Sequence, residues 1–107
     1  MSEEKVPVEI FKALGDETRL KIFLTLSRSP DRLCVSDVVK QLGISQPAVS
    51  QHLKILKAAG LADSARKGHK IHYGVNREFF RDALEKLVGL VMNVDAVLPE
   101  LLVDSTA

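Results

Sequence analysis

The chain has 107 residues, with 15 Lys and Arg against 14 Asp and Glu, and its five aromatic residues include no tryptophan. This length predicts one domain, residues 1–107, with a modest core of aliphatic side chains. The single cysteine excludes an intramolecular disulfide, and no apolar run is long enough for a membrane span or a signal peptide. We therefore expect a cytoplasmic protein without a membrane partner, with disorder at residues 1–6 and 103–107.

The N-terminal third predicts two helices. Residues Val8–Leu14 form an amphipathic segment that ends at Gly15. Asp16 is a suitable N-cap for a second helix over residues 17–27, because a short carboxylate can accept the free N–H groups of the first turn. In this second helix, the residues expected to face inward are Leu20, Phe23 and Leu24.

The segment 35–60 predicts two more helices, over residues 36–42 and 46–59, joined by a tight turn. Gly43 and Gly60 each follow a helix, at the position where a left-handed backbone favours glycine. This arrangement predicts a helix-turn-helix. An ordinary antiparallel helix pair has the same local signals and is the alternative.

Serines are expected to cap both of these helices. Ser36 is the predicted N-cap of the first, and Ser45 that of the second. Proline is tolerated in a first helical turn, but Pro47 has no N–H, so the Ser45 hydroxyl has to accept from Ala48.

The helix over 46–59 has two different faces. A buried stripe is predicted at Val49, Leu53 and Leu56. The polar face repeats at steps of four, four and three, and consists of Gln46, Ser50, Lys54 and Lys57. A small polar and basic face on an otherwise packed helix suits the major groove of DNA.

The next segment predicts a β-hairpin. A strand over 61–66 leads into a basic turn over 66–70. Ile71, Tyr73 and Val75 then alternate with polar or small residues, which predicts a second strand with these three side chains on its buried face. A hairpin directly after such a helix is the wing of a winged helix-turn-helix. The predicted fold is therefore mainly α with a small β-hairpin, in the order α-α-α-α-β-β-α.

Basic residues concentrate where these motifs lie. Residues 40–77 hold seven Lys and Arg against Asp63 alone, a net charge of +6, whereas the rest of the chain carries −5. This distribution is typical of phosphate contact. A winged helix that binds another protein without DNA is the alternative. The predicted contacts to double-stranded DNA are Ser45, Gln46, Ser50, Gln51, Lys54, Lys57, Arg66, Lys67, His69 and Lys70.

The last predicted helix, over 78–98, has a broad apolar stripe. The stripe is wider than the surface that so small a core has to bury. The extra apolar surface indicates a second contact, with a symmetry mate. A helix covered wholly by its own domain is the alternative. The predicted interface of this homodimer consists of Ile10, Phe11, Phe80, Leu84, Leu87, Val91, Val94 and Leu98.

Several motifs together resemble the ArsR/SmtB family of bacterial and archaeal repressors, over roughly residues 8–100. They are residues 13–22 (ALGDETRLKI), residues 45–56 (SQPAVSQHLKIL), Ala59-Gly60-Leu61 and His72-Tyr73. The resemblance implies a homodimeric winged helix that binds an imperfect inverted repeat near a promoter. It also implies that a ligand weakens DNA binding.

The metal sites of that family are incomplete in this chain. Many members bind soft ions with two cysteines one residue apart, but here Cys34 is followed by Ser36, whose hydroxyl is a poor ligand for such ions. Residues 78–107 contain no His or Cys for the site that other members have on the last helix. A pair of His69 and His72 lacks further ligands. No metal and no cofactor are expected, and the inducer, a small molecule or a metal, is unknown.

Two further interpretations concern single residues. Cys34 is either a small buried hydrophobe or a sensing thiol, and the second interpretation would make the chain a redox sensor of the same fold. His52 lies beside the buried stripe and is expected to be structural. No nucleophile–base pair, glycine-rich phosphate loop or carboxylate pair forms a recognisable motif, so an enzyme is not expected.

Overall fold

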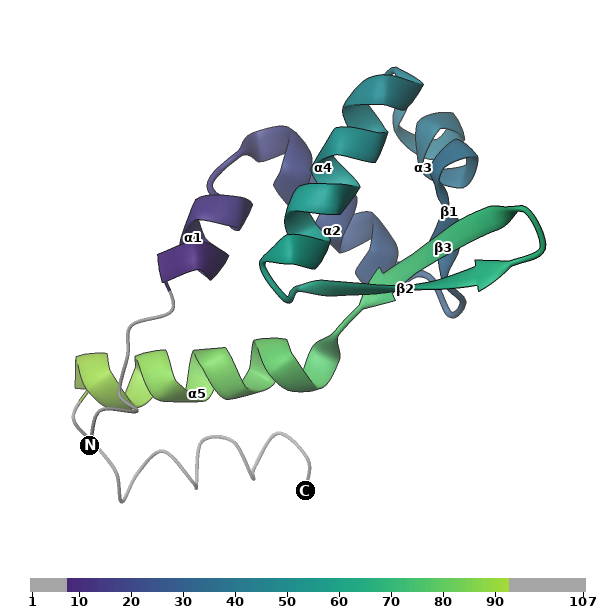
Figure 1. Ribbon diagram of the computed structural model, residues 1–107. Helices are drawn as coiled ribbons and strands as arrows, with labels where there is room; N and C mark the ends of the chain where they lie inside the picture. Colours follow the sequence, from purple (N-terminus) through teal and green to yellow (C-terminus); the bar gives the residue numbers. More distant parts are fainter. Residues whose placement is uncertain (1–7, 93–107) are drawn as a thin grey trace.

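The computed structural model describes residues 8–92 and confirms the predicted winged helix-turn-helix (Figure 1). The predicted interface residues Val94 and Leu98 and the ends expected to be disordered lie outside this range. No helix of the described part is long and apolar enough to cross a membrane. The elements are α1 (Val8–Leu14), α2 (Glu17–Arg28), β1 (Leu33–Cys34), α3 (Val35–Leu42), α4 (Gln46–Ala58), β2 (Ala62–Lys67), β3 (Lys70–Val75) and α5 (Arg77–Met92).

The sheet has three strands where the sequence predicted two. Its order is β1-β3-β2, all antiparallel, and the short β1 pairs Leu33 with Tyr73 and Cys34 with His72. Two residues are too few to show an alternating pattern, which is why β1 was not predicted. The extra strand holds the start of α3 against the base of the wing.

Two of the three predicted helix caps are confirmed. Asp16 Oδ1 accepts the Arg19 N–H at 2.9 Å, and Ser45 Oγ accepts the Ala48 N–H at 3.4 Å. The prediction for Ser36 is wrong, because α3 begins one residue before it, at Val35. The Asp37 carboxylate accepts the Cys34 N–H at 3.0 Å instead, and a charged acceptor makes a stronger hydrogen bond than a hydroxyl.

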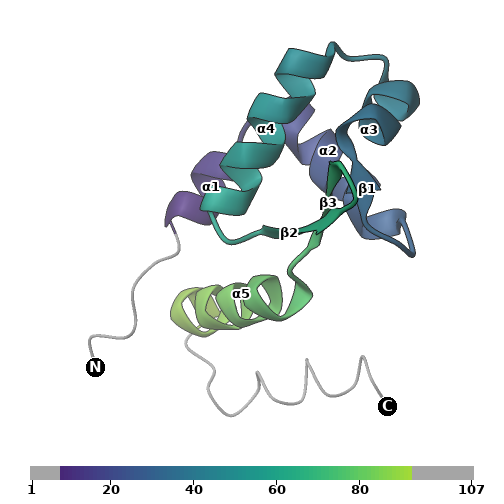
Figure 2. The same ribbon diagram turned by 45° about the vertical axis from the view of Figure 1, so that its right-hand side comes forward.

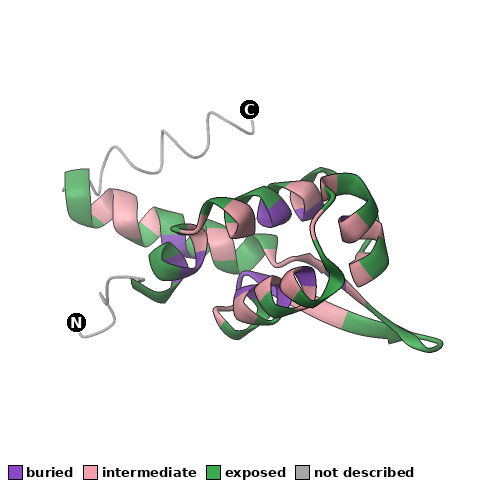
Figure 3. Cartoon of the chain, turned by 90° about the horizontal axis from the view of Figure 1, so that it is seen from above, coloured by how far each residue is buried: buried purple, intermediate pink, exposed green. Residues whose placement is uncertain are grey.

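The core forms where α2, α3, α4 and the sheet meet. The predicted stripe of Val49, Leu53 and Leu56 on α4 is fully buried, as expected. On α2 the inward prediction holds for Phe23 only. Figure 3 shows the buried residues inside the domain, whereas the hairpin tip and the far end of α5 are exposed.

Leu20 and Leu24 were wrongly predicted to face inward, and each is 39% exposed. The core-facing side of α2 carries Ile22, Phe23 and Leu26 instead. Leu20 and Leu24 lie one turn apart beside that side and line a groove against α5. The period of the helix was therefore predicted correctly, but the stripe was rotated.

Helix α5 packs on its own domain over a narrow strip. Ala83 is buried, and the Phe80 ring meets the Phe23 ring edge-on with centroids 5.3 Å apart. In Figures 1 and 2, α5 lies on the opposite side of the domain from α3. The alternative of a helix covered wholly by its own domain is wrong for residues 77–92, because Leu84 is 40% exposed and Val91 72% exposed.

Replacing either of two glycines that have a left-handed backbone is expected to lower stability, by different amounts. At Gly43, with φ +69°, an added Cβ would meet open space, whereas at Gly60, with φ +85°, it would lie 2.8 Å from the Phe79 ring. Gly43→Ala is expected to lower the free energy of unfolding by about 1 kcal/mol, from backbone strain alone. Gly60→Ala should cost about 2 kcal/mol, because Phe79 also has to move. Urea unfolding checks this order, and equal losses would contradict it.

We expect the domain to lose stability in acid because of two hydrogen-bonded aspartates. Hydrogen bonds lower the pKa of Asp16, through the Arg19 N–H, and of Asp37, through the Cys34 N–H and then its S–H, below the ordinary value of 3.8. Because folding favours the charged form, this stabilisation is complete above that value and is lost as pH falls through the lowered pKa. In Asp37→Asn, the urea midpoint of unfolding should fall less below about pH 4 than it does in the wild type. The same dependence of the midpoint on pH in both proteins would refute this.

Candidate nucleic-acid interface

An open cleft of about 480 Å³ separates the polar face of α4 from the wing. Five of the predicted DNA contacts lie around it: Gln46, Ser50 and Lys54 from α4, and His69 and Lys70 from the hairpin. These residues come from positions up to 24 apart in the chain, and the fold brings them to one surface. The rest of the lining consists of Cys34, Val35, Ser36, Ile71 and Tyr73.

The predicted base contacts of α4 differ in whether they line the cleft. Gln46 is exposed in the first turn and lines the cleft, while Gln51 is exposed outside the lining. Ser45 uses a lone pair of its hydroxyl for the Ala48 N–H, so its O–H stays available as a donor. A glutamine amide can exchange two hydrogen bonds with a base edge, and a serine hydroxyl can donate one.

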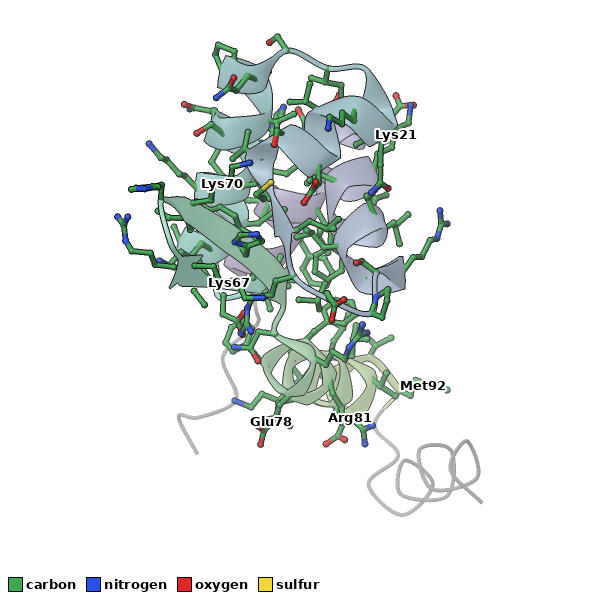
Figure 4. All side chains as sticks on the ribbon, turned by 90° about the vertical axis from the view of Figure 1, so that its right-hand side faces the viewer. Lys21, Lys67, Lys70, Glu78, Arg81 and Met92 are labelled. Atoms are coloured by element: carbon green, nitrogen blue, oxygen red, sulfur yellow. The ribbon has the colours of Figure 1, made fainter. Side chains whose placement is uncertain are left out.

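The wing places cations at its tip. Arg66 and Lys67 on β2 are exposed, and the two-residue turn of Gly68 and His69 joins them to Lys70. Lys67 and Lys70 are directly opposite each other across the ladder, an arrangement that is unfavourable for like charges in water. Both lie on the hairpin, well away from Glu78, Arg81 and Met92 of α5 (Figure 4). A phosphate beside the tip would remove this repulsion.

Two polar contacts hold the wing to neighbouring parts of the domain. The Lys57 ammonium donates to Ser64 Oγ at 2.8 Å, so this predicted DNA contact bridges α4 and β2. Arg32 donates to Asp63 Oδ1 through Nε at 3.0 Å and through a terminal nitrogen at 2.7 Å. The one carboxylate of the basic segment is therefore paired with a cation from outside it.

Sequence reasoning did not assign the other five lining residues to a cleft, and its prediction for Ile71 was wrong. Ile71 was predicted to face the core, but it is 41% exposed and forms part of the cleft wall. The alternation over Ile71, Tyr73 and Val75 is real, but the hairpin extends beyond the core, so only Tyr73 is buried. The distance of a strand residue from the core is not encoded in its alternation.

The environment of Cys34 is that of a packed residue. It is 6% exposed, and its Sγ donates to Asp37 Oδ2 at 3.2 Å. Burial and an anionic neighbour both differ from the electropositive, accessible surroundings of reactive cysteines. Within residues 8–92, no group of three or more His, Cys, Asp or Glu side chains could hold a metal ion.

The predicted dimer residues within the described range differ in exposure. Phe11, Leu84 and Val91 are exposed, and Phe80 and Leu87 are half-buried. Ile10 is 5% exposed and belongs to the core of its own domain, so it is not available for contact with a symmetry mate.

Comparison with known proteins identifies the family. The family described as bacterial regulatory protein, arsR family, matches residues 16–64, which include the helix-turn-helix. The transcriptional repressor SdpR of Bacillus subtilis is 35% identical over 86 residues, covering 80% of this chain and 93% of the repressor. The chain belongs to the ArsR family of transcriptional regulators.

A second relative in this family shares a smaller part of its length. The arsenical resistance operon repressor of Escherichia coli is 44% identical over 68 residues, covering 64% of this chain and 57% of that repressor. The chain thus matches little more than half of the E. coli protein.

Solved ArsR-like structures have the same fold. An ArsR-like transcriptional regulator from Rhodococcus sp. RHA1 covers 94% of this chain and 93% of its own, at a TM-score of 0.77 and 27% identity. A winged helix-turn-helix DNA-binding domain from Mycobacterium bovis, described as homodimeric, covers 83% of this chain and 80% of its own, at a TM-score of 0.64 and 24% identity.

Proposed function

We propose that this ArsR-family chain is a homodimeric repressor that binds an inverted repeat in double-stranded DNA in the cytoplasm. The observation that carries the proposal is the cleft between α4 and the wing, where Gln46, Ser50 and Lys54 face Lys70. The amide and hydroxyl groups of α4 are suited to base edges, and the cations of the wing to phosphates. The role proposed for this chain is therefore that of a regulator, and no catalytic step is assigned to it.

The proposed dimer pairs α5 with its copy. The exposed faces of α5 and α1 carry Phe11, Leu84 and Val91, which are 45%, 40% and 72% exposed. Leu84 and Val91 are two turns apart on α5 and so share one face, and apolar residues grouped in this way mark an association site. A two-fold pair of α5 helices would cover them and place two recognition helices on one duplex. The homodimeric M. bovis domain has the same fold.

Duplex binding at increasing salt tests the proposal. A repressor with this basic surface should lose affinity linearly in log salt, with a slope of about 0.9 for each phosphate contact. The alternative, a winged helix that binds only protein, predicts no shift of a labelled duplex at any salt concentration. Absence of binding at low salt would therefore overturn the proposal.

The proposed repressor is expected not to respond through the two familiar metal sites of its family. Cys34 is one buried thiol beside Ser36, and a soft ion requires three or four sulfur ligands. The DNA-bound chain is titrated with zinc, nickel, cadmium and arsenite, and it should stay bound at stoichiometric ion. Release that persists in Cys34→Ser would mean that another ligand set exists.

A further inference from the structure

The side chain of Arg19, on α2, joins α1 to the recognition helix α4. Its Nε donates to the Ala13 carbonyl at 2.6 Å, and a terminal nitrogen lies 3.3 Å from the Lys12 carbonyl. The other terminal nitrogen lies 3.3 Å from Nδ1 of His52, on α4. One planar guanidinium therefore contacts the C-terminal carbonyls of α1 and a ring on α4 at the same time.

The chemistry of the pair fixes the role of each group. A guanidinium has donors only, so His52 Nδ1 has to accept, which places the ring proton on Nε2. The Ala13 and Lys12 carbonyls lie at the end of α1, where no further helical N–H is available to them. Arg19 supplies that missing donor, so the end of α1 depends on the same side chain that holds His52.

Helices α1 and α4 are separated beside this bridge. A cleft of about 240 Å³ opens between them, lined by Lys12 and Ala13 on one side and by Ile55, Ala58 and Ala59 on the other. Arg19 also lines this cleft. Side chains do not fill the space, so the guanidinium provides a polar connection between the two helices at this point.

We propose that Arg19 is a positioning residue that sets the angle between the recognition helix and α1, and so the spacing of the two recognition helices in the dimer. This inference rests on the proposed function, because α1 carries Phe11 of the proposed interface. An inverted repeat requires both recognition helices at a fixed separation. Binding to unrelated DNA through phosphates has no such requirement.

Substitutions at both ends of the bridge test this role. Arg19→Lys keeps the charge, but one ammonium cannot replace a planar fork that reaches acceptors on two helices. His52→Leu removes the acceptor, whereas His52→Gln keeps an acceptor oxygen and should restore binding. Arg28→Lys is the matched control, because Arg28 is exposed at the end of the same helix.

Affinity is measured by fluorescence anisotropy on an inverted repeat selected from random duplexes by the wild-type chain, and on an unrelated duplex. Arg19→Lys and His52→Leu should each weaken binding to the repeat about tenfold, equivalent to about 1.4 kcal/mol, and leave the unrelated duplex unchanged. The double variant should lose no more than Arg19→Lys alone, because Arg19→Lys already breaks the contact that His52→Leu removes. Sedimentation should show that all variants remain dimers.

The outcomes separate the two proposals. If the wild type selects no repeat, the proposed function fails and this inference fails with it. If the wild type binds its repeat but Arg19→Lys behaves like Arg28→Lys, only the inference is wrong. Equal losses on both duplexes, or additive losses in the double variant, would indicate general destabilisation and would also overturn it.

Discussion

Val91→Glu is expected to convert the dimer into a folded monomer and to lower the affinity for an inverted repeat by about 10²-fold or more, since the second half-site would no longer be held nearby. Val91 is 72% exposed in the isolated domain, so the domain does not need it to fold. In the proposed α5 pair, the added carboxylate would be buried without a partner, which is costly. Sedimentation velocity at micromolar concentration measures the change directly.

Lys86→Glu is the control for this experiment. Lys86 is on the same helix but on its polar side, so a carboxylate placed there should leave the dimer intact. The thermal midpoint of the Val91→Glu monomer should show that it is folded. A wild type that sediments as a monomer at micromolar concentration, or a Val91→Glu dimer, would contradict the proposed interface.

Gln46→Ala is expected to relax sequence preference and to cost about 1–3 kcal/mol of binding to the preferred site, the range for a bidentate contact to a base edge. Gln46 lines the cleft in the first turn of α4, where side chains of a recognition helix contact bases. Competition between the selected repeat and its single-base variants measures the loss of preference.

Lys67→Ala should behave differently, because Lys67 lies at the tip of the wing and is assigned to phosphate. We expect a similar loss on every duplex and a salt slope lower by about one unit. Preference among base variants should not change. If Gln46→Ala and Lys67→Ala give the same selectivity and the same salt slope, the division between base and phosphate contacts is wrong.

Local patterns in the sequence predicted most of the fold. The Ser45 cap, the glycines at 43 and 60, and the buried stripe of α4 are each set by neighbours within a few residues, and all are confirmed. The errors have a common cause in packing between distant segments. Cys34 belongs to β1 because it pairs with His72, and α3 begins directly after it at Val35, one residue before the predicted cap Ser36.

The candidate site shows the same contrast between local patterns and packing of distant segments. The residues of α4 and the wing could be chosen from periodicity and charge, but their meeting around one cleft is a property of the fold. Arg19 lies in a family motif but had no predicted role, because its partner His52 is 33 residues away in the chain. Ile71 was placed in the core because alternation does not show how far a hairpin projects.

Sequencing the DNA that co-purifies with the cross-linked chain would show whether it recognises an inverted repeat. We expect enrichment of one such repeat, with half-sites one helical turn or a multiple of about 10 base pairs apart, as two equivalent recognition helices require. The same enrichment should be lost in Val91→Glu. Recovery of unrelated fragments without a shared repeat, or of no DNA above background, would contradict the claim that this chain is a dimeric, sequence-specific repressor.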